Sequence, residues 1–173
     1  MNRSAFLSSS ASLVALAGAS AGAAESVPGG THLVERKSDF DEAAFAGLVG
    51  RPADVRQMWE AVAFRPGVFN NIKNSLNGLR FGYGYAPDRI AMAFCPHGPS
   101  SAYTFTDEIW TKYKIGEFFK LADAAGAPIT SNVFLKPAKP LDASTDPDDP
   151  SSVFQDTSIQ TLQSRGVVFL TCH

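Results

Sequence analysis

GVVFLTCH, residues 166–173, joins a short apolar run to a cysteine and a histidine. A continuous run rich in β-branched and aromatic residues is typical of a strand that is buried on both faces. In an open parallel sheet, ligands and reactive groups gather at the carboxyl ends of the strands. We therefore expect Cys172 and His173 at a site of this kind.

A second run, RIAMAFCPHG at residues 89–98, repeats the pattern. Its apolar residues predict another strand, and Cys95 and His97 follow where that strand ends. The carboxyl ends of parallel strands lie on the same edge of a sheet, so His97 is expected within reach of Cys172. Neighbouring residues of a strand point to opposite faces, so His173 is not expected to assist Cys172 directly.

Strands and helices alternate along the rest of the chain. The expected strands cover residues 55–64, 90–94, 129–135 and 166–172. The expected helices cover residues 39–49, 66–79, 107–126 and 157–165. An acidic, proline-rich loop is expected at residues 136–156. This alternation predicts an α/β fold with a doubly wound, mostly parallel sheet and helices on both of its faces.

The composition is that of a folded domain, with 45% of the residues hydrophobic and 18% charged. The formal net charge of -2 gives no electrostatic case for binding nucleic acid or an anionic membrane surface. No phosphate-binding loop, serine-nucleophile motif or acid/base carboxylate pair stands out in the sequence. We assign no cofactor. The two cysteines could form one bridge, contribute to one metal site or remain independent thiols.

Residues 1–23 have the features of a signal peptide. Arg3 precedes a short apolar stretch, and Ala21-Gly22-Ala23 has the form of a cleavage site. The stretch is too short and too rich in serine to anchor the chain stably in a membrane. Export would place the protein in an oxidising periplasmic or secreted environment. Residues 24–54 would then be an N-terminal extension with a short helix. A disordered Ala/Ser-rich tail is the alternative.

Asparagines are concentrated on the helix expected at residues 66–79. They are Asn70, Asn71, Asn74 and Asn77. Asparagine is a poor helix former because its amide competes for backbone groups, so some of these residues are candidates for ligand binding. The candidate ligand-binding residues are Asn71, Asn74, Tyr83, Cys95 and Gly98. A solvated polar face with local capping is the alternative.

Three stretches resemble the DsrE/DsrF-like family: residues 70–77, residues 90–98 and residues 162–172. The resemblance covers roughly residues 55–172 and is closest to an exported branch of the family. It implies that residues 55–173 form a DsrE-like domain with a flavodoxin-like three-layer α/β/α fold, often assembled as a homo-oligomer. Family members continue past the cysteine with a helix and one more strand, so we expect this sequence to lack them. A second subunit could cover the sheet that they would otherwise cover.

The same resemblance implies a sulfur chemistry. In sulfur-carrier members, one cysteine at the end of this strand takes up a persulfide, and Cys172 matches that position. We therefore expect a sulfur-carrier or thiol-redox role for Cys172, with His97 as its helper and a sulfur donor or acceptor protein as its partner.

The residues also leave other roles open. Cys172 could be a small, inert core residue, and a structural role is favoured for Cys95 because Pro96 stiffens the loop after it. The pairs Cys95/His97 and Cys172/His173 could bind zinc or copper, although their spacing matches no familiar signature and we assign no metal. A Cys95–Cys172 disulfide is a further alternative. So is a non-enzymatic domain of the same fold that binds a small ligand or serves in assembly.

Overall fold

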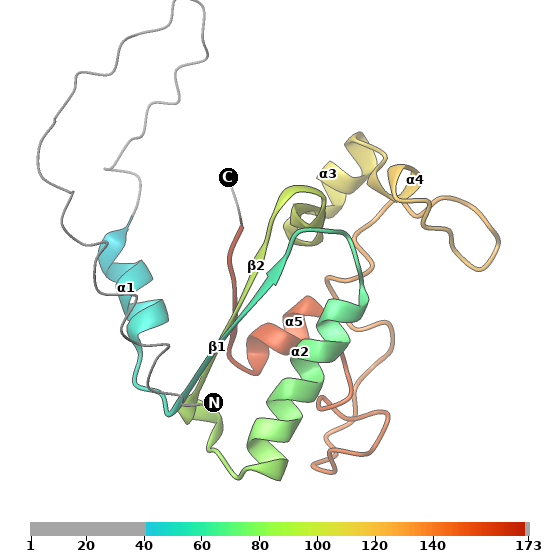
Figure 1. Ribbon diagram of the computed structural model, residues 1–173. Helices are drawn as coiled ribbons and strands as arrows, with labels where there is room; N and C mark the ends of the chain where they lie inside the picture. The colour runs from blue at the N-terminus through green and yellow to red at the C-terminus, as the bar shows by residue number, and fades with distance from the viewer. Residues whose placement is uncertain (1–40, 172–173) are drawn as a thin grey trace, which may run out of the picture. The chain divides into compact units, whose positions relative to one another are not determined.

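Three parallel strands form the sheet in the computed structural model, which describes residues 41–171 (Figure 1). The strands are β1 (Val55–Ala61), β2 (Ile90–Pro96) and β3 (Val167–Phe169), and their order in the sheet is β1-β2-β3. An α/β fold with an open, all-parallel sheet is thereby confirmed. The predicted signal peptide, residues 1–23, lies outside the described residues, as do Cys172 and His173.

Two helices, α2 (Gly67–Asn77) and α5 (Ile159–Ser164), cover one face of this sheet. In α2 the buried apolar residues are Phe69, Ile72 and Leu76, which recur every three to four residues as predicted. They pack against Phe94 of β2 and the apolar residues of α5. Burying a side chain of this size stabilises the fold by roughly 1.5–3 kcal/mol, so this stripe fixes α2 on the sheet.

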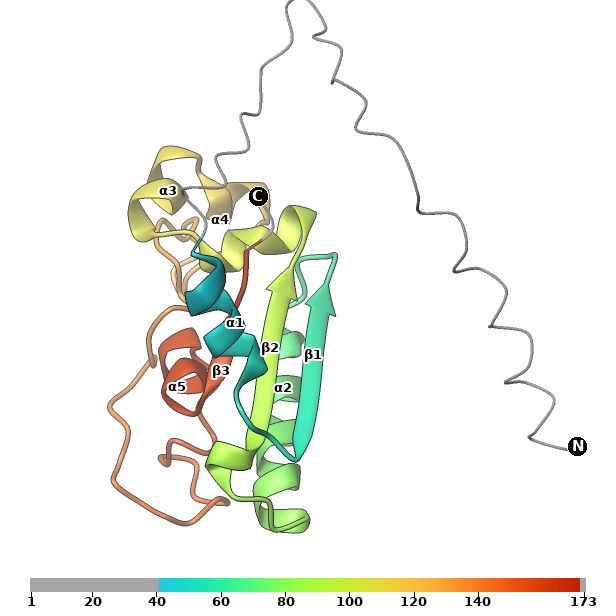
Figure 2. The same cartoon turned by 90° about the vertical axis from the view of Figure 1, so that its left-hand side faces the viewer.

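The opposite face of the sheet is only partly covered. Helix α1 (Glu42–Gly50) lies on that side, across the sheet from α2 (Figure 2). Asp41 caps α1 by accepting a hydrogen bond from the Ala44 backbone N–H at 2.8 Å, yet none of the helix's residues is buried. Burial alternates along β2, and Met58 of β1 is 69% exposed on this open face. The expectation of strands buried on both faces is therefore wrong.

The long helix expected at residues 107–126 is also wrong. Two short helices, α3 (Asp107–Lys112) and α4 (Ile115–Phe118), replace it. Lys114 between them has a left-handed backbone with φ of 50°, a conformation that no α-helix can continue through. After α4, Asp123 accepts hydrogen bonds from two backbone N–H groups, and Gly126 (φ of 83°) completes a turn.

Residues 129–135 do not form the expected third strand. Their carbonyl groups bond to helices instead of to a neighbouring strand: Phe134 O and Leu135 O accept from the first N–H groups of α5. The Asn132 side chain ties this segment to the chain that follows β2. Its amide donates to the Tyr103 and Phe105 carbonyls, both at 2.8 Å. The segment thus closes the aromatic core and adds no strand to the sheet.

The loop at residues 136–156 contains no helix or strand, as predicted. Two side chains of α2 hold it in place. Lys73 Nζ donates to Gln155 Oε1 at 2.9 Å, and Asn77 Nδ2 donates to the Phe154 carbonyl at 2.9 Å. Among residues 41–171, no helix is both long and apolar enough to cross a bilayer.

Candidate thiol site at the carboxyl edge of the sheet

Three side chains meet where β1 and β2 end. Cys95 lies opposite Glu60 in the parallel pairing of the two strands, and both residues belong to the open face. His97 is the first residue after β2. Its Nε2 atom lies 3.6 Å from Cys95 Sγ and 3.2 Å from Glu60 Oε1. One ring nitrogen therefore faces both the thiol and the carboxylate.

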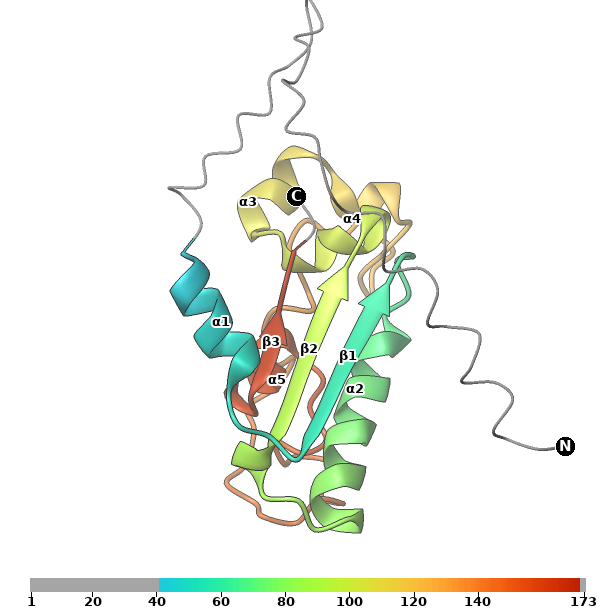
Figure 3. The ribbon, with the colours of Figure 1, turned by 60° about the vertical axis from the view of Figure 1, so that its left-hand side comes forward.

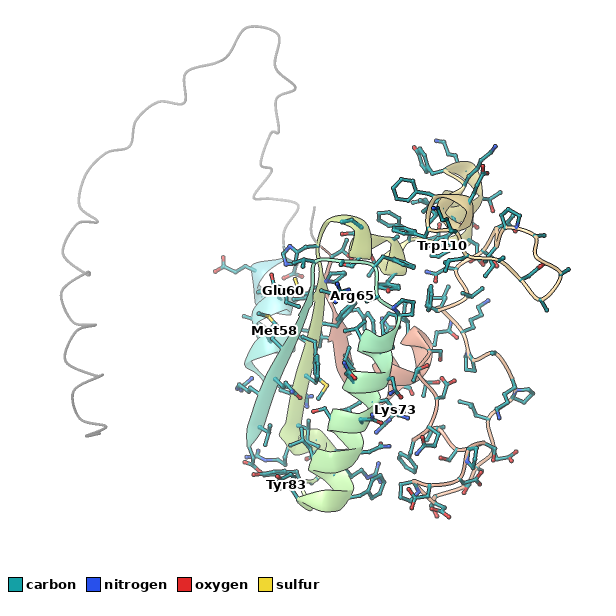
Figure 4. All side chains as sticks on the ribbon, turned by 45° about the vertical axis from the view of Figure 1, so that its right-hand side comes forward. Met58, Glu60, Arg65, Lys73, Tyr83 and Trp110 are labelled. Atoms are coloured by element: carbon teal, nitrogen blue, oxygen red, sulfur yellow. The ribbon has the colours of Figure 1, made fainter. Side chains whose placement is uncertain are left out.

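Figure 3 shows the arrangement of strands that produces this meeting point. β1, β2 and β3 run side by side in the same direction, so their carboxyl ends share one edge. Figure 4 shows Glu60 and Met58 projecting from β1 on the side away from α2. Because side chains alternate along a strand, residues two apart share a face, and Glu60 thereby reaches the exit of β2.

Backbone hydrogen bonds orient His97. It directly precedes the short 3₁₀ helix at Gly98–Thr104, and its backbone carbonyl accepts hydrogen bonds from the Ser100 N–H at 3.2 Å and from Ser100 Oγ at 2.8 Å. Ser100 Oγ in turn accepts from the His97 N–H at 2.9 Å. The Glu60 carboxylate beside Nε2 only accepts hydrogen bonds, so we assign a ring hydrogen to Nε2, where it can be donated to a thiolate or to the carboxylate.

The site is open to solvent. The side chains of His97 and Glu60 are 38% and 60% exposed, and Cys95 is half-buried. A groove of about 560 Å³ adjoins it at the end of β1, lined by residues that include Glu60, Arg65, Asn70 and Asn71. A small reactant or the cysteine of a partner protein therefore has a route to this edge.

The predicted site residues are only partly brought together. Asn71 lines the groove beside Glu60, whereas Asn74 is exposed further along α2. Tyr83 lies at the other end of the domain from Glu60 (Figure 4). Gly98 follows His97 directly and has φ of 52°, which favours glycine at this sharp exit from β2. Cys172, the other predicted catalytic residue, lies outside the described residues.

Two alternatives from the sequence concern the same residues. Cys95 is a free cysteine, and the other half of the disulfide considered above lies outside the described residues. Within residues 41–171, no group of three or more histidine, cysteine, aspartate or glutamate side chains is arranged to hold a metal ion.

Two members of this site were not predicted from the sequence. Glu60 precedes the end of a strand whose register was unknown, so nothing marked it as the neighbour of Cys95. Ser100 carried a recognisable signal, since a serine three residues after a helix cap can complete a reciprocal capping arrangement. That arrangement fixes the backbone of His97 at the exit of β2.

Comparison of the chain with protein-family models, with curated proteins and with solved structures gives no match in any of the three.

Proposed function

We propose that this protein is a thiol-dependent sulfur carrier or thiol-redox domain whose reactive sulfur is Cys95. The observation that supports this most directly is the 3.6 Å contact between Cys95 Sγ and His97 Nε2 at the open carboxyl edge of the sheet. Sulfur transfer requires a thiolate, and a cysteine beside a hydrogen-bond donor or a cationic group forms one more readily. Cys95 has such a neighbour in His97 and is only half-buried.

The transfer step uses no redox partner. The Cys95 thiolate attacks the outer sulfur of a donor persulfide, R–S–SH, and a new sulfur–sulfur bond forms on Cys95 while that of the donor breaks. The donor leaves as a thiol, R–SH, after taking up a proton. Cys95 becomes a persulfide. A second thiolate can then take its outer sulfur by the same type of reaction, which returns Cys95 to a thiol. His97 supports this step by donating its Nε2 hydrogen to the sulfur anion.

The resemblance to DsrE/DsrF-like proteins supports the same class of chemistry but implies Cys172 as the carrier. We propose that the chain has the flavodoxin-like three-layer arrangement of that family, in keeping with its parallel sheet. Cys172 remains the second candidate for the sulfur-bearing residue. An exported location, based on residues 1–23, is part of the same proposal, and so is a homo-oligomer. The exposed apolar side chain of Met58 on the open face is consistent with assembly.

Intact-mass measurement after incubation with a small-molecule persulfide tests this function. We expect wild-type protein and Cys172→Ser to gain the mass of one sulfur atom, reversibly on reduction, and Cys95→Ser to gain none. A sulfur adduct on Cys95→Ser, together with its absence from Cys172→Ser, would show that Cys172 is the sulfur-bearing residue. No sulfur on any of the three proteins, with both thiols reduced, would refute the sulfur-carrier function and favour a non-enzymatic domain that binds a ligand in the groove beside Glu60.

A further inference from the structure

A second cavity lies at the amino end of the sheet, away from the thiol site. It has a volume of about 280 Å³, and its lining includes Arg80 and Arg165 with the apolar side chains of Leu76, Ile90 and Phe154. Ile90 begins β2 and Cys95 comes five residues later, so the cavity and the thiol lie about 16 Å apart along the strand.

The two arginines converge on one aromatic ring. The Cζ atoms of Arg80 and Arg165 lie 4.9 Å and 5.3 Å from the centroid of the Phe154 ring. Arg80 comes from the π-helical turn at Gly78–Gly82, and Arg165 directly follows α5. Elements far apart in the sequence thus bring two positive charges to the same cavity.

No negative charge compensates them among the described residues. Neither arginine takes part in an ion pair there, whereas Arg89 nearby is paired with Asp54. Arg165 donates one hydrogen bond, from Nη2 to Asn77 Oδ1 at 2.6 Å, and its Nη1 atom is buried without an acceptor in this part of the chain. Burial, together with repulsion from Arg80, lowers the pKa of Arg165 to about 10. A buried, unpaired donor on a cation is costly unless something binds it.

We infer that this cavity binds a doubly charged tetrahedral oxyanion, a phosphate or sulfate group, either free or at the end of a small molecule. Guanidinium groups match the geometry of such oxygens and donate several hydrogen bonds to them. Two positive charges with no neighbouring acid favour a dianion over a monocarboxylate. The apolar walls of the cavity leave room for a small organic group attached to the anion.

Calorimetric titration of the full chain with inorganic phosphate, phenyl phosphate and acetate, at constant ionic strength, tests the inference. We expect phosphate to bind and acetate to bind much more weakly. Tighter binding of phenyl phosphate than of phosphate would identify an ester as the ligand class, and equal binding would identify the free anion. The absence of binding by both phosphates would overturn the inference.

Arg80→Gln is the informative variant because the Arg80 side chain makes no hydrogen bond within the described residues, so its replacement should leave the fold intact. Losing one charged donor should weaken phosphate binding about tenfold or more. Lys112→Gln removes the same charge from the exposed end of α3 and should bind like wild type. Equal affinity in wild type and Arg80→Gln would refute the assignment. Cys95→Ser should bind phosphate like wild type, so the phosphate-site proposal and the thiol-site proposal are tested independently.

Discussion

His97 Nε2 contacts Cys95 Sγ at 3.6 Å and Glu60 Oε1 at 3.2 Å, so the thiol and the carboxylate compete for one ring hydrogen. This differs from a catalytic triad, in which the carboxylate holds the nitrogen that does not face the nucleophile. Here the carboxylate and the thiol face the same nitrogen, Nε2. Glu60 therefore weakens the hydrogen bond that His97 can donate to the Cys95 sulfur.

Glu60→Gln should accordingly make Cys95 more reactive. The change removes a negative charge that opposes the thiolate and a strong acceptor that competes for the His97 hydrogen. We expect the rate of iodoacetamide alkylation at pH 7 to rise about two- to fivefold, a modest gain because a less basic thiolate is also a weaker nucleophile. The measurement uses the Cys172→Ser background so that one thiol reacts. A slower rate would show that Glu60 activates the site.

Tyr103 should make the fold sensitive to alkaline pH. Burial raises the pKa of the Tyr103 hydroxyl, and the interaction with the Arg65 backbone lowers it only in part. The hydroxyl oxygen is buried and has no hydrogen-bond partner of normal geometry among the described residues. Above about pH 10 the unfolded chain loses the tyrosine proton while the folded chain keeps it, so stability falls as the pH rises. Tyr103→Phe should lose less stability than wild type between pH 8 and pH 11 in urea unfolding.

The exposed Tyr113→Phe is the control for this comparison, since its side chain is 64% exposed and should not report on burial. It should lose as much stability as wild type over the same pH range. An equal loss in Tyr103→Phe and wild type would show that Tyr103 is not responsible for the alkaline sensitivity.

Asn132→Ala should destabilise the fold by about 3 kcal/mol. Its amide donates to the Tyr103 and Phe105 carbonyls, and its Oδ1 atom accepts from the Phe134 N–H at 3.1 Å, so the change leaves three backbone groups without partners. Urea unfolding measures the loss. Asn74→Ala, on the exposed side of α2, should stay within about 0.5 kcal/mol of wild type. Similar losses in the two variants would contradict the role of Asn132.

Gly116→Ala should be about 3 kcal/mol less stable than wild type. A Cβ atom at this position would lie 1.9 Å from the Ile129 carbonyl oxygen, and backbone must move to admit it. Gly47→Ala, in the open part of α1, meets nothing within 4 Å and should gain up to about 1 kcal/mol from its helix propensity. Thermal unfolding of both variants gives the comparison. A stable Gly116→Ala would mean that α4 does not approach Ile129 so closely.

Local patterns predicted the scaffold of the site well. The apolar spacing of Phe69, Ile72 and Leu76 identified α2, and the run at residues 90–94 identified β2, because both signals depend on burial against one sheet. The expectation that reactive residues gather at the carboxyl edge rests on the parallel connection alone. The pairing of Glu60 with Cys95 could not be predicted, since register depends on how two distant strands align.

The prediction for the region between β2 and α5 was wrong for a physical reason. Residues 129–135 are apolar enough for a strand, but their carbonyls accept hydrogen bonds from α5, and only the folded chain brings those partners together. The left-handed backbone at Lys114 also has no sequence signal, because lysine rarely adopts it. Asp123 and Gly126 are ordinary turn residues and were the available sign that no long helix runs to residue 126.

The alkylation rate of Cys95 with and without His97 tests most directly whether this edge of the sheet is a thiol site. In the Cys172→Ser background at pH 7, we expect His97→Gln to react about three- to tenfold more slowly with iodoacetamide, because the thiolate loses its hydrogen-bond donor. Peptide mass mapping confirms that Cys95 is the residue modified, and an unchanged melting temperature shows that the fold is intact. Equal rates in the two proteins, with the fold intact, would contradict a His97-assisted thiol.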